Sequence, residues 1–168
     1  MIDTKTKILD AAERLFARKG FDATSMRHII ADAGVNLAAI HYHFGSKEEL
    51  LLAVVRRRVG PVNDERLRQL DEAERHGTPD VEQVLRAFFV PAFRMIRHNP
   101  EVARLVGRLY GERDVLPNIF RTVFGDLIQR FSAAMRRALP QLPGDEFVWR
   151  MHFSIGAMAH TLRMTPVL

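Results

Sequence analysis

The sequence contains no cysteine and no long uninterrupted run of apolar residues. Without cysteine, disulfide bonds, thiolate nucleophiles and cysteine-ligated zinc sites are excluded. Without an apolar run of roughly 20 residues, no membrane-spanning helix is expected. The first residues, MIDTKTKILDAAERLF, form an amphipathic pattern that includes acidic side chains, unlike a signal peptide. We therefore expect a cytoplasmic protein that does not act at a membrane.

The residues that are present suit a globular protein with a substantial core. Apolar residues make up 47% of the 168 residues, which is enough for one or two domains. The net charge is +5, and lysine and arginine outnumber acidic residues by ten to seven in 1–60 and by fifteen to thirteen afterwards. A basic chain suits an anionic partner such as nucleic acid, but this spread-out excess does not by itself decide the partner.

The pattern along the chain is helical, because apolar residues recur every three or four positions and no convincing strand alternation is present. Gly, Pro, Ser, Thr and Asn fall where helices begin and end. We therefore predict an all-α fold. The expected helices cover about 4–19, 26–33, 37–43, 47–76, 79–98, 100–111, 117–139 and 145–163. Pro61 and Pro91 fall inside two of them and are expected to kink these helices, or at Pro61 to break one.

Residues 29–44 have the pattern of a helix-turn-helix in which Gly34 forms the turn. Val35, Ile40 and Phe44 are expected to hold the second helix against its support. The opposite side of that helix then carries Leu37, Ala38, His41 and Tyr42. Small residues at the start of this side would let the helix enter a major groove of DNA. The alternative is an ordinary short helix of a helical bundle.

Polar side chains near this helix suit phosphate groups. Tyr42 and Lys47 are placed so that a hydroxyl and an ammonium group could contact one phosphate. Ser25 and Arg27 lie at the capped start of the preceding helix, where backbone N–H groups also favour anions. These four residues therefore add a second indication of DNA binding.

The segment TKTKILDAAERLFARKGFDATSMRHIIADAGVNLAAIHYHFGSKEELLLAVV resembles the amino-terminal domain of TetR-family bacterial transcription regulators. Within residues 4–55, the matching positions are Gly20-Phe21, Thr24, Ala33-Gly34-Val35-Asn36, Tyr42-x-Phe44 and Lys47-Glu48. The resemblance implies a helix-turn-helix DNA-binding domain at 1–46, a linking helix at 47–60, and a ligand-binding and dimerisation domain at 61–168. It also implies a repressor that binds a pseudo-palindromic operator in double-stranded DNA as a homodimer and is released by a small molecule.

The resemblance also implies roles for individual residues. Leu37, Ala38 and His41 would face bases, whereas Ser25, Tyr42 and Lys47 would hold phosphates. The complete expected DNA-binding set is Ser25, Arg27, Asn36, Leu37, Ala38, Ala39, His41, Tyr42 and Lys47. His43 is expected to pack or cap. Ile30 stands where the family usually has a small residue, which predicts a wider crossing of the two helices.

The last long segment, FVWRMHFSIGAMAHTL at 147–162, contains Arg150 as its only formally charged residue. A helix with so little charge is expected to be buried on more than one side. We therefore expect a dimer interface at Phe147, Trp149, Met151, Ile155, Met158 and Leu162. A central core helix of a compact bundle is the alternative. The family normally has one further dimerising helix, and the sequence ends at Leu168 before it, so either the dimer forms differently or the sequence is incomplete.

Aromatic residues in the second half are numerous enough to line an apolar cavity for a small hydrophobic or amphipathic effector, although plain core packing is the alternative. An arginine inside such a cavity would suit a carboxylate or phosphate. The expected ligand-binding residues are Phe89, Phe93, His98, Arg104, Arg108, Tyr110, Phe120 and Phe124, with Arg113 as a further polar candidate. The segments GVNLAAIHYHFGSK, RRVGP and FVWRMHFSIGA are together similar to the fatty-acid-responsive branch of the family, which implies a fatty acid or acyl-CoA effector.

Catalytic and metal sites are not expected. His41 and His43 are two residues apart on a helix, so their rings point about 200° from each other and one ion cannot easily bind both. The sequence contains no H-E-x-x-H motif, phosphate-binding glycine loop or nucleophile elbow. We therefore expect no enzymatic activity, cofactor or metal, with metal sensing through His98 or His152 as the open alternative. The competing class of function is a helical module that acts through protein contacts alone.

Overall fold

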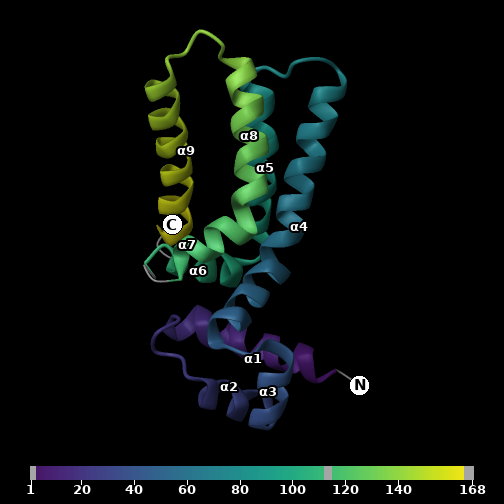
Figure 1. Ribbon diagram of the computed structural model, residues 1–168, viewed down its shortest axis with the longest axis vertical. Helices are drawn as coiled ribbons and strands as arrows, with labels where there is room; N and C mark the ends of the chain where they lie inside the picture. Colours follow the sequence, from purple (N-terminus) through teal and green to yellow (C-terminus); the bar gives the residue numbers. More distant parts are fainter. Residues whose placement is uncertain (1–2, 112–114, 165–168) are drawn as a thin grey trace.

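The computed structural model describes residues 3–111 and 115–164, and all regular secondary structure within these residues is helical. Helices α1 (Thr4–Lys19), α2 (Met26–Ala33) and α3 (Leu37–Phe44) form one end of the molecule, which we call the helix-turn-helix unit (Figure 1). The all-α prediction is confirmed for the described part of the chain.

A single long helix, α4 (Lys47–Arg75), leaves this unit and runs to the opposite end of the molecule (Figure 1). Helices α5 (Val81–His98), α8 (Gly125–Ala138) and α9 (Gly144–Met164) stand at that upper end. The waist of the molecule contains α6 (Pro100–Leu109), α7 (Leu116–Ile119) and η1 (Phe120–Phe124), which is a π-helical turn leading into α8.

Capping residues explain why the first helices begin where the sequence predicts. Ser25, Asn36 and Ser46 each precede a helix, and the side chain of each accepts a hydrogen bond from the backbone N–H three residues later. Such a bond satisfies one of the N–H groups that have no partner within the helix. Asn36 does so at 2.8 Å to the N–H of Ala39. These caps therefore set the start of α2, α3 and α4.

Other boundaries differ from the prediction. Helix α5 begins at Val81 rather than at Pro79, because Asp80 and Gln83 form a reciprocal capping box in which each side chain accepts from the other's backbone N–H. Both α4 and α5 continue through their prolines, so Pro61 does not break its helix. The single helix expected at 117–139 is divided into α7, η1 and α8.

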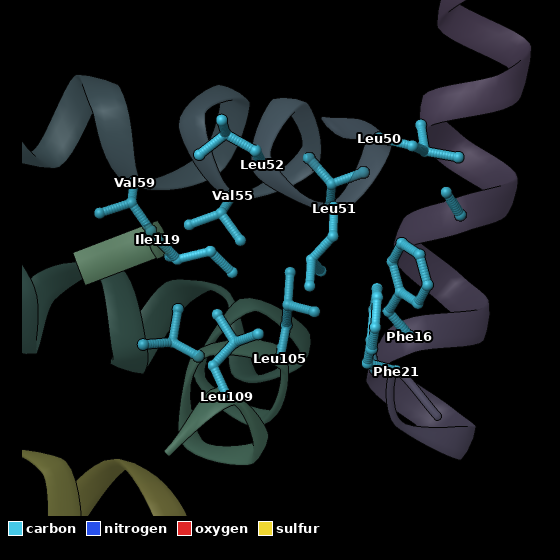
Figure 2. Close-up of a cluster of buried hydrophobic side chains, with 14 of the residues drawn as sticks. Phe16, Phe21, Leu50, Leu51, Leu52, Val55, Val59, Leu105, Leu109 and Ile119 are labelled. Atoms are coloured by element: carbon cyan, nitrogen blue, oxygen red, sulfur yellow. The ribbon is translucent and has the colours of Figure 1, made fainter. Parts of the chain in front are cut away.

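One buried apolar cluster extends from the helix-turn-helix unit into the waist. Figure 2 shows side chains of α1, α4 and α6 meeting in it, among them Phe16, Leu51 and Leu105. Arg57 of α4 also pairs with Asp10 at 2.8 Å and with Glu13 at 2.5 Å, both on α1. The helix-turn-helix unit is therefore packed firmly against the rest of the chain. The division at 1–46, 47–60 and 61–168 stays a prediction, since the cluster crosses both boundaries.

A second buried cluster lies at the upper end, where α4, α5, α8 and α9 meet. It includes Leu70, Val84, Phe131 and Phe147. Among the helices that the structure describes, none combines the length and the apolar character that crossing a membrane requires.

Candidate nucleic-acid interface

One side of helix α3 packs against the core of the helix-turn-helix unit. Ile40 is fully buried (0% exposed) and Phe44 is buried next to it, while Val35 packs half-buried against the same cluster. The opposite side is exposed, and Tyr42 retains 87% of its accessible surface. Leu37, Ala38 and His41 are exposed with it. The predicted orientation of α3 is therefore confirmed.

The turn before α3 depends on a glycine. Gly34 has φ +63° and ψ 39°, which is the left-handed region that residues with a Cβ adopt at a cost. In this conformation the Val35 N–H donates to the Ile30 carbonyl at 3.3 Å, which closes the end of α2. The backbone of Gly34 thus fixes the angle at which α3 leaves α2.

Replacing Gly34 with alanine is expected to lower the unfolding free energy by about 1–2 kcal/mol. An added Cβ would meet no atom within 4 Å, so the cost comes from the backbone alone. Gly60→Ala is the matched control, because Gly60 is also open but lies inside α4, where alanine adds about 0.5–1 kcal/mol of stability. Urea unfolding of the two variants measures the difference. Equal changes in the unfolding free energy of the two variants would contradict the role given to the Gly34 backbone.

His41 is held by its own helix end. Its Nδ1 lies 2.9 Å from the carbonyl oxygen of Gly45. Because a carbonyl oxygen only accepts, this contact assigns the proton to Nδ1 and leaves Nε2 of the neutral ring as an acceptor. Adenine and cytosine present amino donors in the major groove. The exposed His41 ring is therefore suited to accept a hydrogen bond from one of these two bases.

The predicted phosphate-binding residues surround this exposed side. Ser25 and Arg27 are exposed at the start of α2, and the Ser25 oxygen accepts from the His28 N–H at 3.2 Å, which leaves its hydroxyl hydrogen available to donate. Lys47 is half-buried, with its Nζ 4.0 Å from the centroid of the Phe21 ring. That cation–π contact holds the ammonium group at the start of α4.

The other residues of the predicted DNA-binding set take structural places. Asn36 is the N-cap of α3, and Ala39 is half-buried behind Ala38. His43 is half-buried and borders an open cleft of about 520 Å³ between α1, α3 and α4. This placement agrees with the expectation that His43 packs rather than contacts bases.

The residues predicted to form a dimer interface on α9 lie on two different sides of the helix. Phe147, Met158 and Leu162 are buried against other helices of the same chain, and Met151 and Ile155 are half-buried. Their surfaces are largely covered already, because α9 packs against α6 and against the upper cluster. Only Trp149 of the predicted set is well exposed, at 63%.

The exposed side of α9 carries a stripe that the sequence analysis did not identify. Trp149, Phe153, Gly156 and His160 are all exposed and follow each other at the four- and three-residue intervals of one helix face. The rings of Trp149 and Phe153 stack with their centroids 6.2 Å apart, and Phe153 is 71% exposed. We call these four residues the outer stripe of α9.

The predicted ligand-binding residues divide into interior and surface positions. Phe89, Tyr110, Phe120 and Phe124 are half-buried, whereas Phe93, His98, Arg104 and Arg108 are exposed. The Nδ1 of His98 lies 2.7 Å from the Arg94 carbonyl oxygen, and Arg104 pairs with Glu101 at 3.3 Å. Both contacts are therefore local. Arg113 lies outside the described residues. Three of the expected polar lining residues, His98, Arg104 and Arg108, thus face solvent.

Two buried polar residues were missed. Asn63 and Arg66 lie on the buried side of α4, between Val59 and Leu70. The four residues are three or four positions apart, as residues on one face of a helix are. Two polar residues that interrupt an otherwise apolar stripe were the sequence signal for them. Within the described residues, no group of three or more potential metal-binding side chains comes together.

Comparisons with known proteins agree with this geometry. The sequence profile of bacterial regulatory proteins of the tetR family matches residues 8–54, which include α2, α3 and the turn between them. The profile of tetracyclin repressor-like C-terminal domains matches residues 86–167. The two profiles therefore match both ends of the molecule.

Individual proteins are similar over different lengths. The HTH-type transcriptional regulator BetI of Rhizobium meliloti is 32% identical over 105 residues, which are 62% of this chain and 49% of that protein. The chain spans between 21% and 49% of the length of such curated relatives. The SmeT–triclosan complex has 27% identity and a TM-score of 0.73, covering 98% of this chain and 80% of that one. The fatty acid degradation regulator FadR from Bacillus halodurans has the same fold, with a TM-score of 0.71 at 18% identity over 97% of this chain and 84% of that one.

Proposed function

The chain belongs to the TetR family of bacterial regulatory proteins, and we propose that it is a transcriptional repressor that binds a pseudo-palindromic operator as a homodimer and is released by a small-molecule effector. The observation that carries the proposal is the exposed side of α3. It presents Ala38, His41 and Tyr42 to solvent on a helix whose other side is fixed by Ile40. Such a helix can insert its first turns into a major groove.

The proposed division of roles follows from what each side chain offers. Leu37, Ala38 and His41 face the bases, where an apolar contact and the Nε2 acceptor discriminate among base edges. Ser25, Tyr42 and Lys47 bind phosphates and set the position of α3 on the duplex. Arg27 adds a positive charge at the start of α2, where the helix dipole also favours phosphate.

Dimerisation is proposed to use the outer stripe of α9. Two α3 helices must lie about 34 Å apart to contact successive turns of DNA, which requires a second subunit. Exposed aromatic residues such as Trp149 and Phe153 are enriched at interfaces between proteins. A Cβ added at Gly156 would meet no atom within 4 Å, so a partner helix could approach the α9 backbone closely there.

Release by an effector is proposed to pass through α4 and α6. Helix α4 carries Lys47 at its start and enters the upper end of the molecule, while α6 packs against both α1 and α9. That SmeT is a complex with triclosan supports small-molecule binding by this fold. We propose a hydrophobic or amphipathic effector, including fatty acids and acyl-CoA. Effector and DNA would then weaken each other's binding by the same factor, typically about 1–3 kcal/mol.

We further infer that the protein acts in the cytoplasm by binding and not by catalysis. The matched family profile describes regulatory proteins, and the similar protein BetI is described as a transcriptional regulator. The competing proposal is a helical module that contacts proteins only. It predicts that the chain does not bind duplex DNA even at low salt, where phosphate contacts are strongest.

DNA binding by phosphate-contact variants tests the proposal. A duplex selected by the protein from a random pool and an unselected duplex serve as ligands. Tyr42→Ala and Lys47→Ala are each expected to weaken binding to both by about tenfold, as loss of a phosphate contact affects all sequences. Lys47→Ala should also reduce the slope of log affinity against log salt by about 1 per subunit.

Two controls accompany these variants. Tyr42→Phe removes only the hydroxyl, and Arg86→Ala removes an exposed cation from the part of α5 whose Val84 and Ala87 pack in the upper cluster. Arg86→Ala should bind both duplexes like the unaltered chain. If the double variant Tyr42→Ala, Lys47→Ala keeps full affinity, α3 does not bind DNA in the proposed way.

A further inference from the structure

Arg66 is a buried positive charge at the centre of the molecule. Its side chain comes from α4 and is only 2% exposed. Burial lowers the pKa of its guanidinium to about 10, an effect that nearby Tyr110 opposes. Arg66 therefore remains charged at neutral pH in an apolar interior.

The charge of Arg66 has no anionic partner within residues 3–111 and 115–164. The ion pairs among these residues join other arginines, and His76, to acidic groups, whereas the hydrogen bonds of Arg66 go to neutral groups. Burying an unpaired charge costs several kcal/mol even after relaxation. Buried charges in proteins are normally paired, so an uncompensated one indicates a place for an anion.

The guanidinium is oriented by one contact at its Nε edge and one on its face. Its Nε donates to the Phe88 carbonyl at 2.7 Å, and its carbon lies 4.4 Å from the centroid of the Phe88 ring. These contacts fix the plane of the group. The remaining edge, which carries the two terminal nitrogens, is the fork that binds carboxylates in a bidentate manner.

That fork is weakly satisfied. One terminal nitrogen donates to Asn63 Oδ1 at 3.1 Å, and the other lies 3.4 Å from Met158 Sδ, a thioether that is a poor acceptor. Each terminal nitrogen carries two hydrogens, so a carboxylate could bind here with modest displacement. Asn63 is itself positioned by donating to the Val123 carbonyl at 2.9 Å in the π-helical turn η1. Such turns occur frequently at functional sites.

Two apolar cavities lie along α9, on the side that faces the other helices of the upper end. Ile155 and Met151 precede Met158 on α9 by about one and two turns. Both border a cavity of about 260 Å³ between α8 and α9, close to the lower limit of roughly 300 Å³ for ligand pockets. They also border a small cavity of about 20 Å³ that reaches Phe88, the ring stacked on Arg66. Phe88 therefore links the Arg66 guanidinium to the smaller of the two apolar cavities.

We propose that Arg66, positioned by Phe88 and assisted by Asn63, is the receptor for the carboxylate of an amphipathic effector whose apolar tail lies between α8 and α9. This inference rests on the proposed regulation by an effector. It narrows the effector class, because a head group bound at so buried a position must be small. A free carboxylate fits this description, whereas a coenzyme A thioester has no charge at that atom and carries a large nucleotide.

Calorimetric titration of the full chain with dodecanoate, dodecan-1-ol and dodecanoyl-CoA, each below the concentration of micelle formation, tests the proposal. The unaltered chain is expected to bind dodecanoate at least tenfold more tightly than the other two. Arg66→Met keeps a long side chain of similar shape without the charge and should bind dodecanoate about 10- to 100-fold more weakly, as expected for loss of hydrogen bonds to a charged group. The affinity of Arg66→Lys for dodecanoate should lie between those of the unaltered chain and Arg66→Met, because lysine keeps the charge but not the two terminal nitrogens of the guanidinium.

Arg86→Met is the matched control, since Arg86 is exposed and pairs with Glu82 on the same helix. It should bind dodecanoate like the unaltered chain. Equal binding of dodecanoate by Arg66→Met, equal binding of the alcohol, or no binding of dodecanoate by the unaltered chain would each overturn the proposal. DNA binding without any amphiphile is measured in parallel, because it tests the proposed function separately and should be unchanged by Arg66→Met.

Discussion

Replacing Phe153 with glutamate is expected to yield a folded monomer that binds a palindromic duplex about 1000-fold more weakly than the unaltered chain, the size of effect that losing a second linked contact produces. The outer stripe of α9 carries Phe153 at its middle, 71% exposed and stacked on Trp149. In a monomer, a glutamate at this exposed position changes stability by no more than about 0.5 kcal/mol. In a dimer it would place an unpaired carboxylate against apolar surface, which costs several kcal/mol for each subunit.

Analytical ultracentrifugation and thermal unfolding followed by circular dichroism separate assembly from folding in this variant. Binding to a half-site duplex should be nearly unchanged, because each α3 remains intact, whereas the advantage of the full palindrome should disappear. Gln129→Glu, on an exposed position of α8, adds the same charge outside the stripe and should leave the dimer intact. A dimer of undiminished stability in Phe153→Glu would show that the outer stripe is not the interface.

A second variant tests the outer stripe of α9 by adding a bulky side chain instead of a charge. Gly156 has open space around an added Cβ, and leucine favours a helix more than glycine by nearly 1 kcal/mol. Gly156→Leu should therefore stabilise the monomer slightly while it obstructs close approach of a partner helix. A more stable monomer with a weaker dimer is the expected pair of results.

The helix-turn-helix unit was predictable from the sequence because its signals are local. Ser25 and Asn36 cap helices by bonding a backbone N–H three residues away, and Gly34 supplies a conformation that other residues avoid. The spacing of Ile40 and Phe44 then determines which side of α3 is exposed. Each of these features depends on a few neighbouring residues.

The two sides of α9 could not be distinguished in this way. The segment has apolar residues around its whole circumference, so periodicity does not separate Phe147, which packs inward, from Phe153, which faces solvent. That distinction is set by α6 and by the upper cluster, which are distant in sequence. The π-helical turn at η1 depends likewise on a distant partner, since Asn63 of α4 binds its Val123 carbonyl.

Arg66 was missed for a different reason. Its position in the apolar stripe of α4 was visible, but arginine on a helix is usually exposed, and burial of one depends on neighbours from other helices. Those neighbours are Phe88 of α5 and Met158 of α9. The only signal for a buried Arg66 in the sequence pattern is therefore that Asn63 and Arg66 interrupt the apolar stripe of α4.

Replacing Ile40 with alanine is expected to abolish measurable binding to operator DNA while costing about 2–4 kcal/mol of unfolding free energy. Ile40 is fully buried and is one of only two buried side chains of α3. An eight-residue helix is too short to be stable in isolation, so α3 depends on this contact to keep its position. Ile40→Val, which removes one methyl group, should cost only about 0.5–1.5 kcal/mol and retain DNA binding.

Leu70→Ala is the control that separates local from global effects. Leu70 is equally buried but lies in the upper cluster, away from the helix-turn-helix unit. It should lose about 2–5 kcal/mol of unfolding free energy and still bind operator at 25 °C, provided the fold persists. Urea unfolding and DNA titration of both variants decide between the two explanations. If both lose DNA affinity in proportion to stability, then binding depends on the whole fold, and the seating of α3 by Ile40 has no special part in it.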